Sequence, residues 1–327
     1  MVKTCEYCNK APAKLRRAKN KLMVCLPCFY FHFEEEIHQT IMSENLFNAG
    51  DKIVLGISGG KDSTVMLHTM TTLKDRYNYP IELSLLAIDE GIKGYRDDSI
   101  ETVKSNETTY NVPLKIMSYK DLFGITMDEV VSLTGVRCSC TFCGVFRRRA
   151  LDKGTKILEG TRLYTGHNAD DVAETVLMNA MRGDSFRLVN CTTSTSGLPN
   201  EARRCKPLIY CYEKEIVLYA HYKKLVYFST ECTYSKDAYR GNLKELMKKL
   251  IGLRPQIIID IIKSAGQLKL KPGTRVPTKT TCQTCGNISS HKMCKACQFV
   301  EDLNKLRIEK AEKAKKSQKI EIGISEQ

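Results

Sequence analysis

Short hydrophobic runs alternate with longer amphipathic segments through the centre of the chain. The runs predict four buried strands, at residues 52–57, 83–89, 113–118 and 162–167. Periodic segments between and after the strands predict helices at residues 64–73, 121–133, 169–181, 213–224 and 242–264, and a polar, helix-compatible segment adds 97–110. We expect the polar stretch 184–206 to be a loop. Because strands alternate with helices, the pattern predicts a doubly wound α/β domain, with a parallel sheet covered on both faces.

The two ends of the chain carry paired cysteines instead of this alternation. The sequence holds 15 cysteines and no tryptophan, and several of the cysteines form CxxC pairs. Four thiolates satisfy tetrahedral zinc, and modules this small need a metal to fold. The alternative is a set of free or disulfide-bonded thiols. We expect two closed, structural Zn²⁺ sites, formed by Cys5, Cys8, Cys25 and Cys28 and by Cys282, Cys285, Cys294 and Cys297.

The charge balance points to a polyanionic partner. Lysine and arginine number 51 against 37 aspartates and glutamates, a formal net charge of +14. Such a surplus is typical of proteins that bind nucleic acid, although solubility alone also explains it. No apolar run is long enough for a membrane span, and the N-terminus lacks the apolar stretch of a secretory signal. We therefore expect a cytoplasmic protein that has no membrane partner.

A glycine turn lies directly between the first predicted strand and its helix. It reads SGGKDS, from Ser58 to Ser63, and small residues there let backbone N–H groups surround phosphate oxygens. It is not a Walker A loop, because Leu55 stands where glycine is required and Asp62 follows Lys61. The hexapeptide resembles the PP-loop of the ATP pyrophosphatase superfamily. Members of that superfamily cleave ATP between the α and β phosphates and adenylate a substrate.

The resemblance extends over nearly the whole chain, to about Cys297. The segments TGHNADD (165–171), CTFCGVFRRRAL (140–151), ECTYS (231–235) and AYRG (238–241) resemble the TtuA-like, tRNA 2-thiolation branch of the superfamily. The resemblance implies an adenylating tRNA sulfurtransferase that converts ATP to AMP and pyrophosphate. Its product would be 2-thiouridine at position 34 of cytosolic tRNAs for Lys, Glu and Gln. The implied partners are tRNA, a ubiquitin-like thiocarboxylate carrier, and a second copy or a paralogous thiolation subunit.

The same resemblance assigns roles to individual residues. The phosphate loop would grip ATP, Asp62 would also bind Mg²⁺ and act in catalysis, and Arg147 would neutralise charge on the α-phosphate. Ala87 and Ile88 would frame the adenine at the end of a strand. The full set of nucleotide contacts implied in this way is Ser58, Gly59, Gly60, Lys61, Asp62, Ser63, Ala87, Ile88, Arg147, Gly166 and Asp171.

Three further cysteines, Cys140, Cys143 and Cys232, form an incomplete ligand set. Three thiolates can hold a [4Fe–4S] cluster by three irons and leave the fourth iron open for sulfur. The residues alone leave two alternatives, a persulfide with a resolving cysteine and a zinc site. The resemblance favours the cluster and gives these cysteines catalytic and metal-binding roles. Cys138 departs from the family pattern, where one cysteine fewer is expected, and could compete as a ligand or nucleophile.

Basic residues follow the central CxxC and fill the segment 236–279. That segment holds eleven lysines and arginines against three acidic residues, and Tyr234 and Tyr239 could stack on an unpaired base. Two other functions compete with thiolation: another adenylating reaction of the superfamily on tRNA, and a non-catalytic zinc protein that binds RNA. Clustered cysteines have no task in the first, and an intact phosphate loop argues against the second.

The motifs divide the chain into four parts. We expect an N-terminal zinc module over residues 1–40, then the PP-loop and tRNA-thiolation domain over residues 41–272. A C-terminal zinc module would occupy residues 273–300. The Lys/Glu-rich tail, residues 301–327, is expected to be a frayed helix or disordered.

Overall fold

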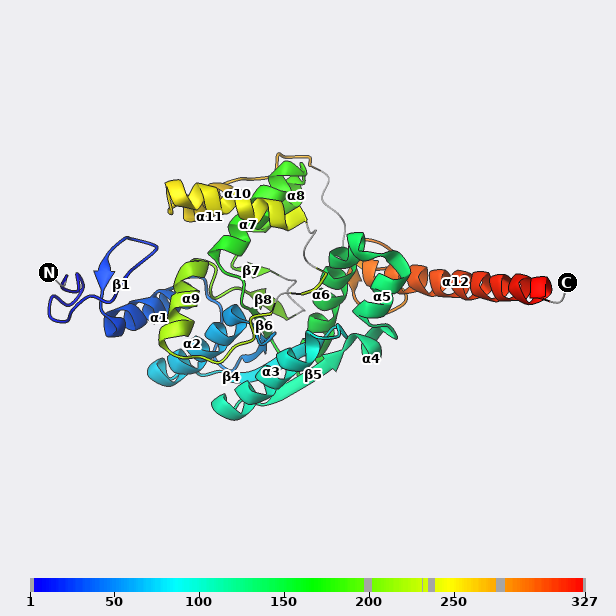
Figure 1. The fold of residues 1–327 in the computed structure, drawn as a ribbon. Helices are drawn as coiled ribbons and strands as arrows, with labels where there is room; N and C mark the ends of the chain where they lie inside the picture. Colours follow the sequence, from blue (N-terminus) through cyan, green and yellow to red (C-terminus); the bar gives the residue numbers. More distant parts are fainter. Residues whose placement is uncertain (1–2, 197–201, 231, 235–238, 275–279, 326–327) are drawn as a thin grey trace.

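The centre of the molecule is a six-stranded sheet with strand order β5-β4-β3-β6-β8-β7 (Figure 1). The computed structural model describes residues 3–196, 202–230, 232–234, 239–274 and 280–325, without the side chains of 239–240 and 314–325. Five neighbouring strands run parallel, and β7 pairs antiparallel at one edge. This confirms the predicted doubly wound α/β fold. The strands are β3 (Lys52–Gly56), β4 (Glu82–Asp89), β5 (Leu114–Ser118), β6 (Arg162–Thr165), β7 (Thr195–Ser196) and β8 (Arg203–Cys205).

Helices cover both faces of the sheet because its central strands are hydrophobic on both sides. In β3, Ile53 and Leu55 join the core cluster that contains α2, α3 and α9 side chains, whereas Val54 belongs to a second cluster that α6 covers. All three side chains are fully buried, as continuous apolar runs in parallel sheets usually are. The helices concerned are α2 (Lys61–Tyr77), α3 (Arg96–Tyr110), α6 (Ser139–Ile157) and α9 (Glu213–Tyr222).

The N-terminal module is continuous with the central domain. It begins with a hairpin of β1 (Leu15–Arg16) and β2 (Met23–Val24), and helix α1 (Leu26–Ser43) follows. One side chain per turn of α1 is buried in the main core: Phe29, Phe33, Ile37 and Ile41. The predicted boundary at residue 40 therefore falls inside a helix that the central core needs.

Arg17 of the N-terminal hairpin region is fully buried between two glutamates. Its guanidinium donates to Glu215 on α9 at 2.6 Å and to Glu36 on α1 at 2.9 Å. The pair has the geometry that a buried charge requires, because an arginine without its carboxylates would cost several kcal/mol, about 3–5. The contact therefore holds the N-terminal module against the first turn of α9.

Two of the predicted helices are each broken into two. The predicted helix 121–133 is α4 (Tyr119–Phe123) followed by α5 (Met127–Thr134), because α4 ends at Gly124 and Thr126 starts a new capping box with Glu129. The predicted helix 242–264 is α10 (Tyr239–Leu253) followed by α11 (Ile257–Gly266). Pro255 separates them, since proline disfavours helical geometry at the residue before it.

The stretch 184–206 is not the simple loop that its polar composition predicts. Helix α7 (Ala169–Met181) matches the predicted bounds, but α8 (Ser185–Asn190) follows it, and β7 and β8 then extend the sheet. Strand β8 reads Arg-Arg-Cys, and only Cys205 is fully buried. A short strand near the sheet edge needs no hydrophobic run, which is why the pattern misses it.

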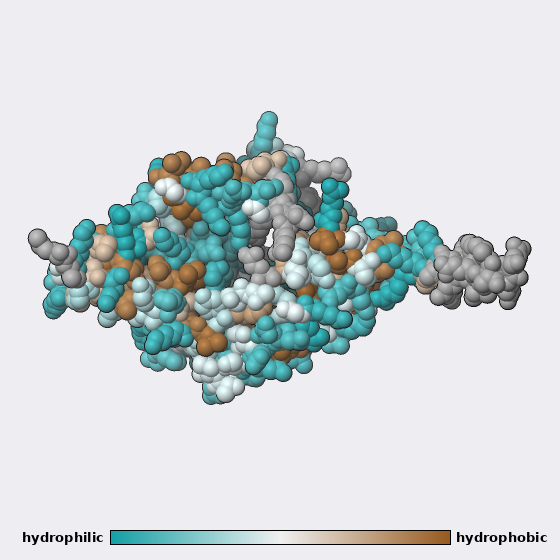
Figure 2. Space-filling view, viewed as in Figure 1, coloured by the Kyte–Doolittle hydropathy of each residue, from teal (hydrophilic) through white to brown (hydrophobic). Residues whose placement is uncertain are grey.

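The C-terminal module lies at the opposite end of the molecule from the N-terminus (Figure 1). Strands β9 (Thr280–Thr281) and β10 (Ile288–Ser289) pair, and helix α12 (Lys295–Ser325) then projects away from the body. The tail, predicted to be a frayed helix or disordered, is helical as far as Ser325. Within the described residues, no helix is both long and apolar enough to cross a membrane. Hydrophilic side chains dominate the face in Figure 2, while hydrophobic ones gather over α10 and α11, where Leu253 is exposed.

Candidate active site and metal centres

The phosphate loop lies where the strand order of the sheet reverses. Strands β4 and β5 extend to one side of β3, and β6 and β8 extend to the other. Ligands of open α/β sheets bind at this switch point, beyond the carboxyl ends of the strands. The loop 58–63 follows β3, and the loop 166–171 follows β6, so the two predicted nucleotide loops are adjacent at that edge.

The phosphate loop turns at Gly59 and is held by hydrogen bonds of Ser63. Gly59 has a φ of +74°, and a Cβ there would lie 2.9 Å from the carbonyl oxygen of Ser99. Ser63 Oγ donates to the carbonyl oxygen of Gly60 at 2.9 Å and accepts from the amide of Ser58 at 3.2 Å. The loop thus presents the amino end of the 17-residue helix α2, which attracts anions such as phosphate.

The loop after β6 packs against the start of α2. A Cβ on Gly166 would lie 3.0 Å from the backbone of Asp62, so any larger residue would push the two segments apart by a few tenths of an ångström. Asn168 Nδ2 donates to Asp62 Oδ1 at 3.0 Å, and Asn168 also caps α7 through the amide of Asp171. Asp62 and Asp171 are therefore brought together by one asparagine that the sequence analysis did not single out.

Lys61 lies between two carboxylates at the mouth of the loop. Its ammonium is 2.7 Å from Glu213, the first residue of α9, and 3.2 Å from Asp62. Burial raises the pKa of Asp62 and the negative charge of Asp171 adds to it, although Lys61 and Asn168 act in the opposite direction. Carboxylates held this close favour a cation, and their oxygens are the ligands that Mg²⁺ prefers.

The end of β4 reaches the same edge of the sheet. Ala87 is buried and Ile88 is partly buried, and both pair with β5 residues. Two residues further on, the carboxylate of Glu90 accepts from Arg147 of α6 at 2.7 Å. The Glu90 side chain is 10% exposed while that of Arg147 is 48% exposed, so the guanidinium is fixed at one end and open to solvent at the other. Sequence reasoning found Arg147 and missed Glu90.

The central cysteines come from two segments. Cys140 and Cys143 lie in the first turns of α6, and Cys232 lies in the segment after α9. Tyr119 Oη donates to the carbonyl oxygen of Cys143 at 2.9 Å and is 3.7 Å from its Sγ. Burial raises the pKa of the Cys143 thiol, and Arg147 one turn later acts against that rise. Cys140 is exposed and the other two are partly buried.

These three thiols do not form the shell of a single ion. Among the described residues, the groups of metal-ligating atoms that lie within 4.8 Å of one another are the two terminal quartets, and the central three are not among them. A zinc ion binds sulfur at about 2.3 Å, so its ligands cannot be more than about 4.6 Å apart. At least one pair of the three central sulfur atoms therefore lies farther apart than one zinc ion allows. Three thiolates are the protein ligands that a [4Fe–4S] cluster with one open iron requires.

The terminal cysteines are assembled as predicted. Cys5, Cys8, Cys25 and Cys28 form one quartet, and Cys282, Cys285, Cys294 and Cys297 form the other. Burial opposes ionisation of Cys5 and Cys282, yet backbone N–H groups outweigh it and lower the pKa of each thiol to about 6. Burial raises the pKa of the other two thiols in each quartet that lie on the helix side, Cys25 and Cys28 and Cys294 and Cys297. Four cysteines gathered around one point, with no open position, are typical of structural zinc sites.

Comparison with known proteins assigns the chain to a family. A PP-loop domain model matches residues 29–250, and a zinc-ribbon model matches residues 280–307. Curated proteins named cytoplasmic tRNA 2-thiolation protein 1 are 54% identical in Oryza sativa and 55% identical in Candida glabrata. The alignments cover 89% of this chain, with 80% and 83% of those proteins. The chain belongs to the cytoplasmic tRNA 2-thiolation protein 1 family.

A solved structure resembles this family member over nearly its full length. It is the U34-tRNA thiolase NcsA from Methanococcus maripaludis with its [4Fe–4S] cluster, at 28% identity and a TM-score of 0.80. The match covers 93% of this chain and 97% of that one. The PP-loop fold expected from the resemblance is thereby confirmed.

Four polar residues complete the site of this family member but were not among the predicted site residues. They are Glu90, Asn168, Asp170 and Glu213. Asp170 accepts from the backbone of Glu213, and burial raises its pKa to about 6. Each lies at the end of a strand or the start of a helix, where polar residues gather around ligands in α/β folds. That position was the signal available in the sequence.

Proposed function

We propose that the protein catalyses ATP-dependent 2-thiolation of uridine 34 in cytosolic tRNAs for Lys, Glu and Gln. The observation that carries the proposal is the arrangement along α6. Cys143 and Arg147 are one helical turn apart, and Arg147 is bound to Glu90 at the end of β4. Helix α6 therefore ties a thiol cluster to the edge of the sheet where the phosphate loop lies. Related proteins bearing thiolation names support the same assignment.

We assign the nucleotide contacts as the resemblance implies. ATP would lie at the switch point, with its phosphates on the amino end of α2 and its adenine against the end of β4. Asp62 and Asp171 would hold Mg²⁺, which supplies charge neutralisation on the phosphates when bound. The proposed contacts are Ser58, Gly59, Gly60, Lys61, Asp62, Ser63, Ala87, Ile88, Arg147, Gly166 and Asp171.

The proposed reaction has two steps, adenylation of the uridine and transfer of sulfur to it. The O2 oxygen of the uridine attacks the α-phosphorus of ATP. The bond between that phosphorus and the oxygen shared with the β-phosphate breaks, and pyrophosphate leaves. Sulfur at the oxidation level of sulfide then adds to C2, and the C2–O bond breaks to release AMP. A carrier thiocarboxylate delivers sulfur at that level, so neither step needs an oxidant or a reductant.

The chain's own residues serve the first step mainly through charge. The Lys61 ammonium and the N–H groups of the loop neutralise the phosphates, and the solvent-facing side of Arg147 reaches toward developing negative charge. Cys140, Cys143 and Cys232 would hold a [4Fe–4S] cluster. With three protein ligands, that group supplies one iron open to exogenous sulfur. Tyr119 orients the turn of α6 that carries Cys143.

The partners we propose follow from the substrate and the family. The net charge of +14 suits tRNA, and the lysines of α10, including Lys244 and Lys248, are exposed. Arg148, on the cysteine helix α6, is exposed as well. A ubiquitin-like carrier would deliver sulfur, and the chain would work as a homodimer or with a paralogous subunit. The relatives named as cytoplasmic place this activity in the cytoplasm.

The proposed function is tested by stoichiometry on a defined tRNA. Protein loaded anaerobically with iron, sulfide and zinc is incubated with ATP, Mg²⁺, inorganic sulfide and a tRNA-Lys transcript. We expect one AMP for each 2-thiouridine that mass spectrometry detects at position 34. A transcript with cytidine at position 34 should give neither product. AMP release without thiolation, or thiolation that ignores position 34, would refute the assignment.

We also propose that each terminal quartet holds one zinc ion. Replacing Cys282 or Cys285 by serine should lower the zinc content from two to one per chain and unfold the C-terminal module locally, since binding and folding are linked. Atomic emission and proteolysis measure the two effects. Cys191→Ser is the control, because Cys191 belongs to neither quartet. Two zinc ions retained in both module variants would contradict the site.

A further inference from the structure

The segment that carries Cys232 is attached to two helices through one residue. Tyr234 lies two positions after Cys232, and its hydroxyl donates to Asp128 Oδ1 on α5 at 2.7 Å. Its main-chain oxygen lies 3.9 Å from Cys140 Sγ, within the range of a thiol hydrogen bond. Tyr234 therefore connects α5, the Cys232 segment and the first turn of α6.

Asp128 is a rigid support for that contact. Its other oxygen, Oδ2, accepts from the amide of Lys93 at 3.1 Å, so both carboxylate oxygens are engaged. The next residue toward the N-terminus, Met127, donates its amide to the carbonyl oxygen of Glu90 at 2.9 Å. The first turn of α5 is thus fixed to the loop that also holds Arg147 of α6.

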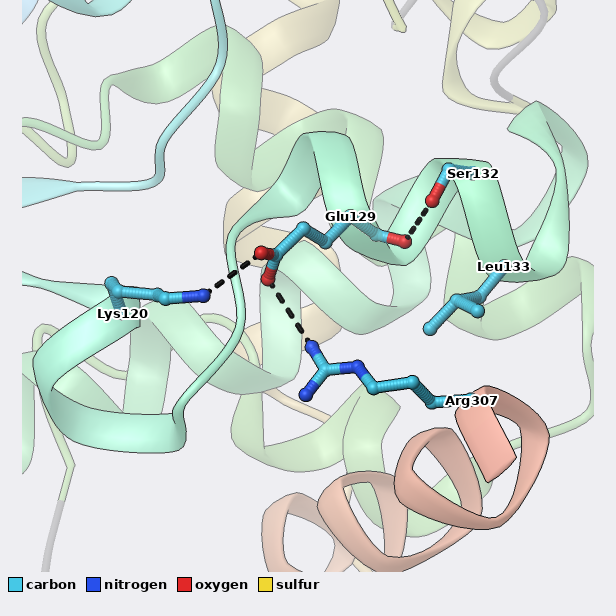
Figure 3. A pocket seen from close by; sticks show the side chains of 5 residues that line it. All are labelled: Lys120, Glu129, Ser132, Leu133 and Arg307. Carbon is cyan, nitrogen blue, oxygen red and sulfur yellow. Dashed lines mark hydrogen bonds and ion pairs between the residues drawn. The ribbon is translucent and has the colours of Figure 1, made fainter. Parts of the chain in front are cut away.

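A second side of α5 is fixed by the C-terminal helix. In Figure 3, Glu129 accepts from Lys120 at 2.8 Å and from Arg307 of α12 at 3.3 Å, at the edge of a cavity between α4, α5 and α12. Lys310 also donates to the carbonyl oxygen of Ser132 at 2.8 Å. Helix α5 is therefore held by contacts on two sides, which leaves Asp128 little freedom to move.

The same C-terminal module packs on the cysteine turn of α6. Phe299 of α12 lies 4.3 Å, between ring centroids, from Phe142, which stands between Cys140 and Cys143. Cys143 and Cys232 both pack against the hydrophobic cluster that contains Phe299. Helix α6 therefore contacts α12, α12 contacts α5, and α5 contacts Tyr234. Tyr234 in turn contacts Cys140 at the start of α6.

We propose that Tyr234 and Asp128 are positioning residues that hold Cys232 at the correct distance from Cys140 and Cys143. Neither side chain touches the reacting atoms in this proposal; each acts through Cys232. A cluster held by three thiols from two segments needs the separate third ligand to be presented correctly before metal arrives. This inference rests on the proposed function only in assuming that the three cysteines bind a cluster. The distance between Cys232 and the other two can be measured whether or not that function is correct.

The test measures how often Cys232 meets Cys140 in iron-free protein. In a Cys138→Ser, Cys143→Ser background, the full chain is equilibrated with reduced and oxidised glutathione. The equilibrium constant for the Cys140–Cys232 disulfide gives their effective concentration. Removing a hydrogen bond to a charged group should lower this constant, so we expect Tyr234→Phe to reduce it at least about tenfold. The melting temperature and ATP affinity should stay unchanged.

Two variants make the result specific. Tyr77→Phe removes the same hydroxyl from a tyrosine that donates to Glu35, far along the chain from the cysteines, and should leave the constant unchanged. Asp128→Ala removes the bond from Tyr234 and also the bond from the Lys93 amide, so it should lower the constant at least as much as Tyr234→Phe. Adding Tyr234→Phe to Asp128→Ala should cause no further loss, because the bond between the two side chains is already gone. Equal constants in Tyr234→Phe and the parent would overturn the proposal while leaving the thiolation assay unaffected. A parallel loss of melting temperature and ATP affinity would overturn it too, because it would show a general structural role.

Discussion

Replacing Lys61 or Asp62 by alanine should reduce tRNA thiolation at least about a thousandfold. In the proposed function, Lys61 would neutralise phosphate charge, and Asp62 would hold Mg²⁺ beside it. The fold should survive, because both side chains are partly exposed and neither belongs to the core. Pyrophosphate release in a single turnover measures the chemical step, and circular dichroism checks the fold.

A lysine at the other end of the same strand provides the control. Lys52 begins β3 and pairs with Glu159 on the surface, so Lys52→Ala removes an equal charge away from the phosphate loop. Its thiolation rate should stay within about twofold of the parent, as exposed ion pairs contribute little. Normal thiolation by both the Lys61 and the Asp62 variants would show that ATP is not bound where we place it.

Serine at any one of Cys140, Cys143 and Cys232 should abolish both cluster binding and thiolation. Hydroxyl oxygen is a poor ligand for iron beside thiolate, and a cluster with two protein ligands would not be retained. ATP binding should persist, because the phosphate loop lies at the start of α2, whereas the cysteines lie on α6 and in the segment after α9. Iron content, the visible absorption spectrum and nucleotide affinity separate these effects.

Cys138→Ser is the control for these three replacements, because Cys138 is a nearby cysteine outside the proposed ligand set. Cys138 precedes α6 in a short 3-10 turn and is exposed, so we expect near-normal iron content and activity in the variant. The persulfide alternative makes a different forecast. Iron-free protein, given a sulfur donor and a reductant, would thiolate tRNA at the rate of the loaded enzyme. That result would contradict the cluster proposal and support the persulfide.

Local patterns predicted the parts of the site that depend on neighbouring residues. The strand before Ser58 is a continuous hydrophobic run, and the CxxC pairs supply two ligands from one turn, so both could be placed from sequence. Partners distant along the chain could not. Glu213 meets Lys61, and Glu90 meets Arg147, only because parallel strands end at one edge of the sheet. Strand β8 was missed because its residues are mostly polar.

The buried position of Arg17 has a consequence for how the protein is made. Its partner Glu215 is 198 residues later in the sequence. A ribosome that adds about 5–20 residues per second needs roughly 10–40 s to cover that interval. During that time the N-terminal hairpin can place Arg17 against Glu36, 19 residues later, but it cannot bury the arginine against α9. The N-terminal module therefore completes its packing only after the first turn of α9 has been synthesised.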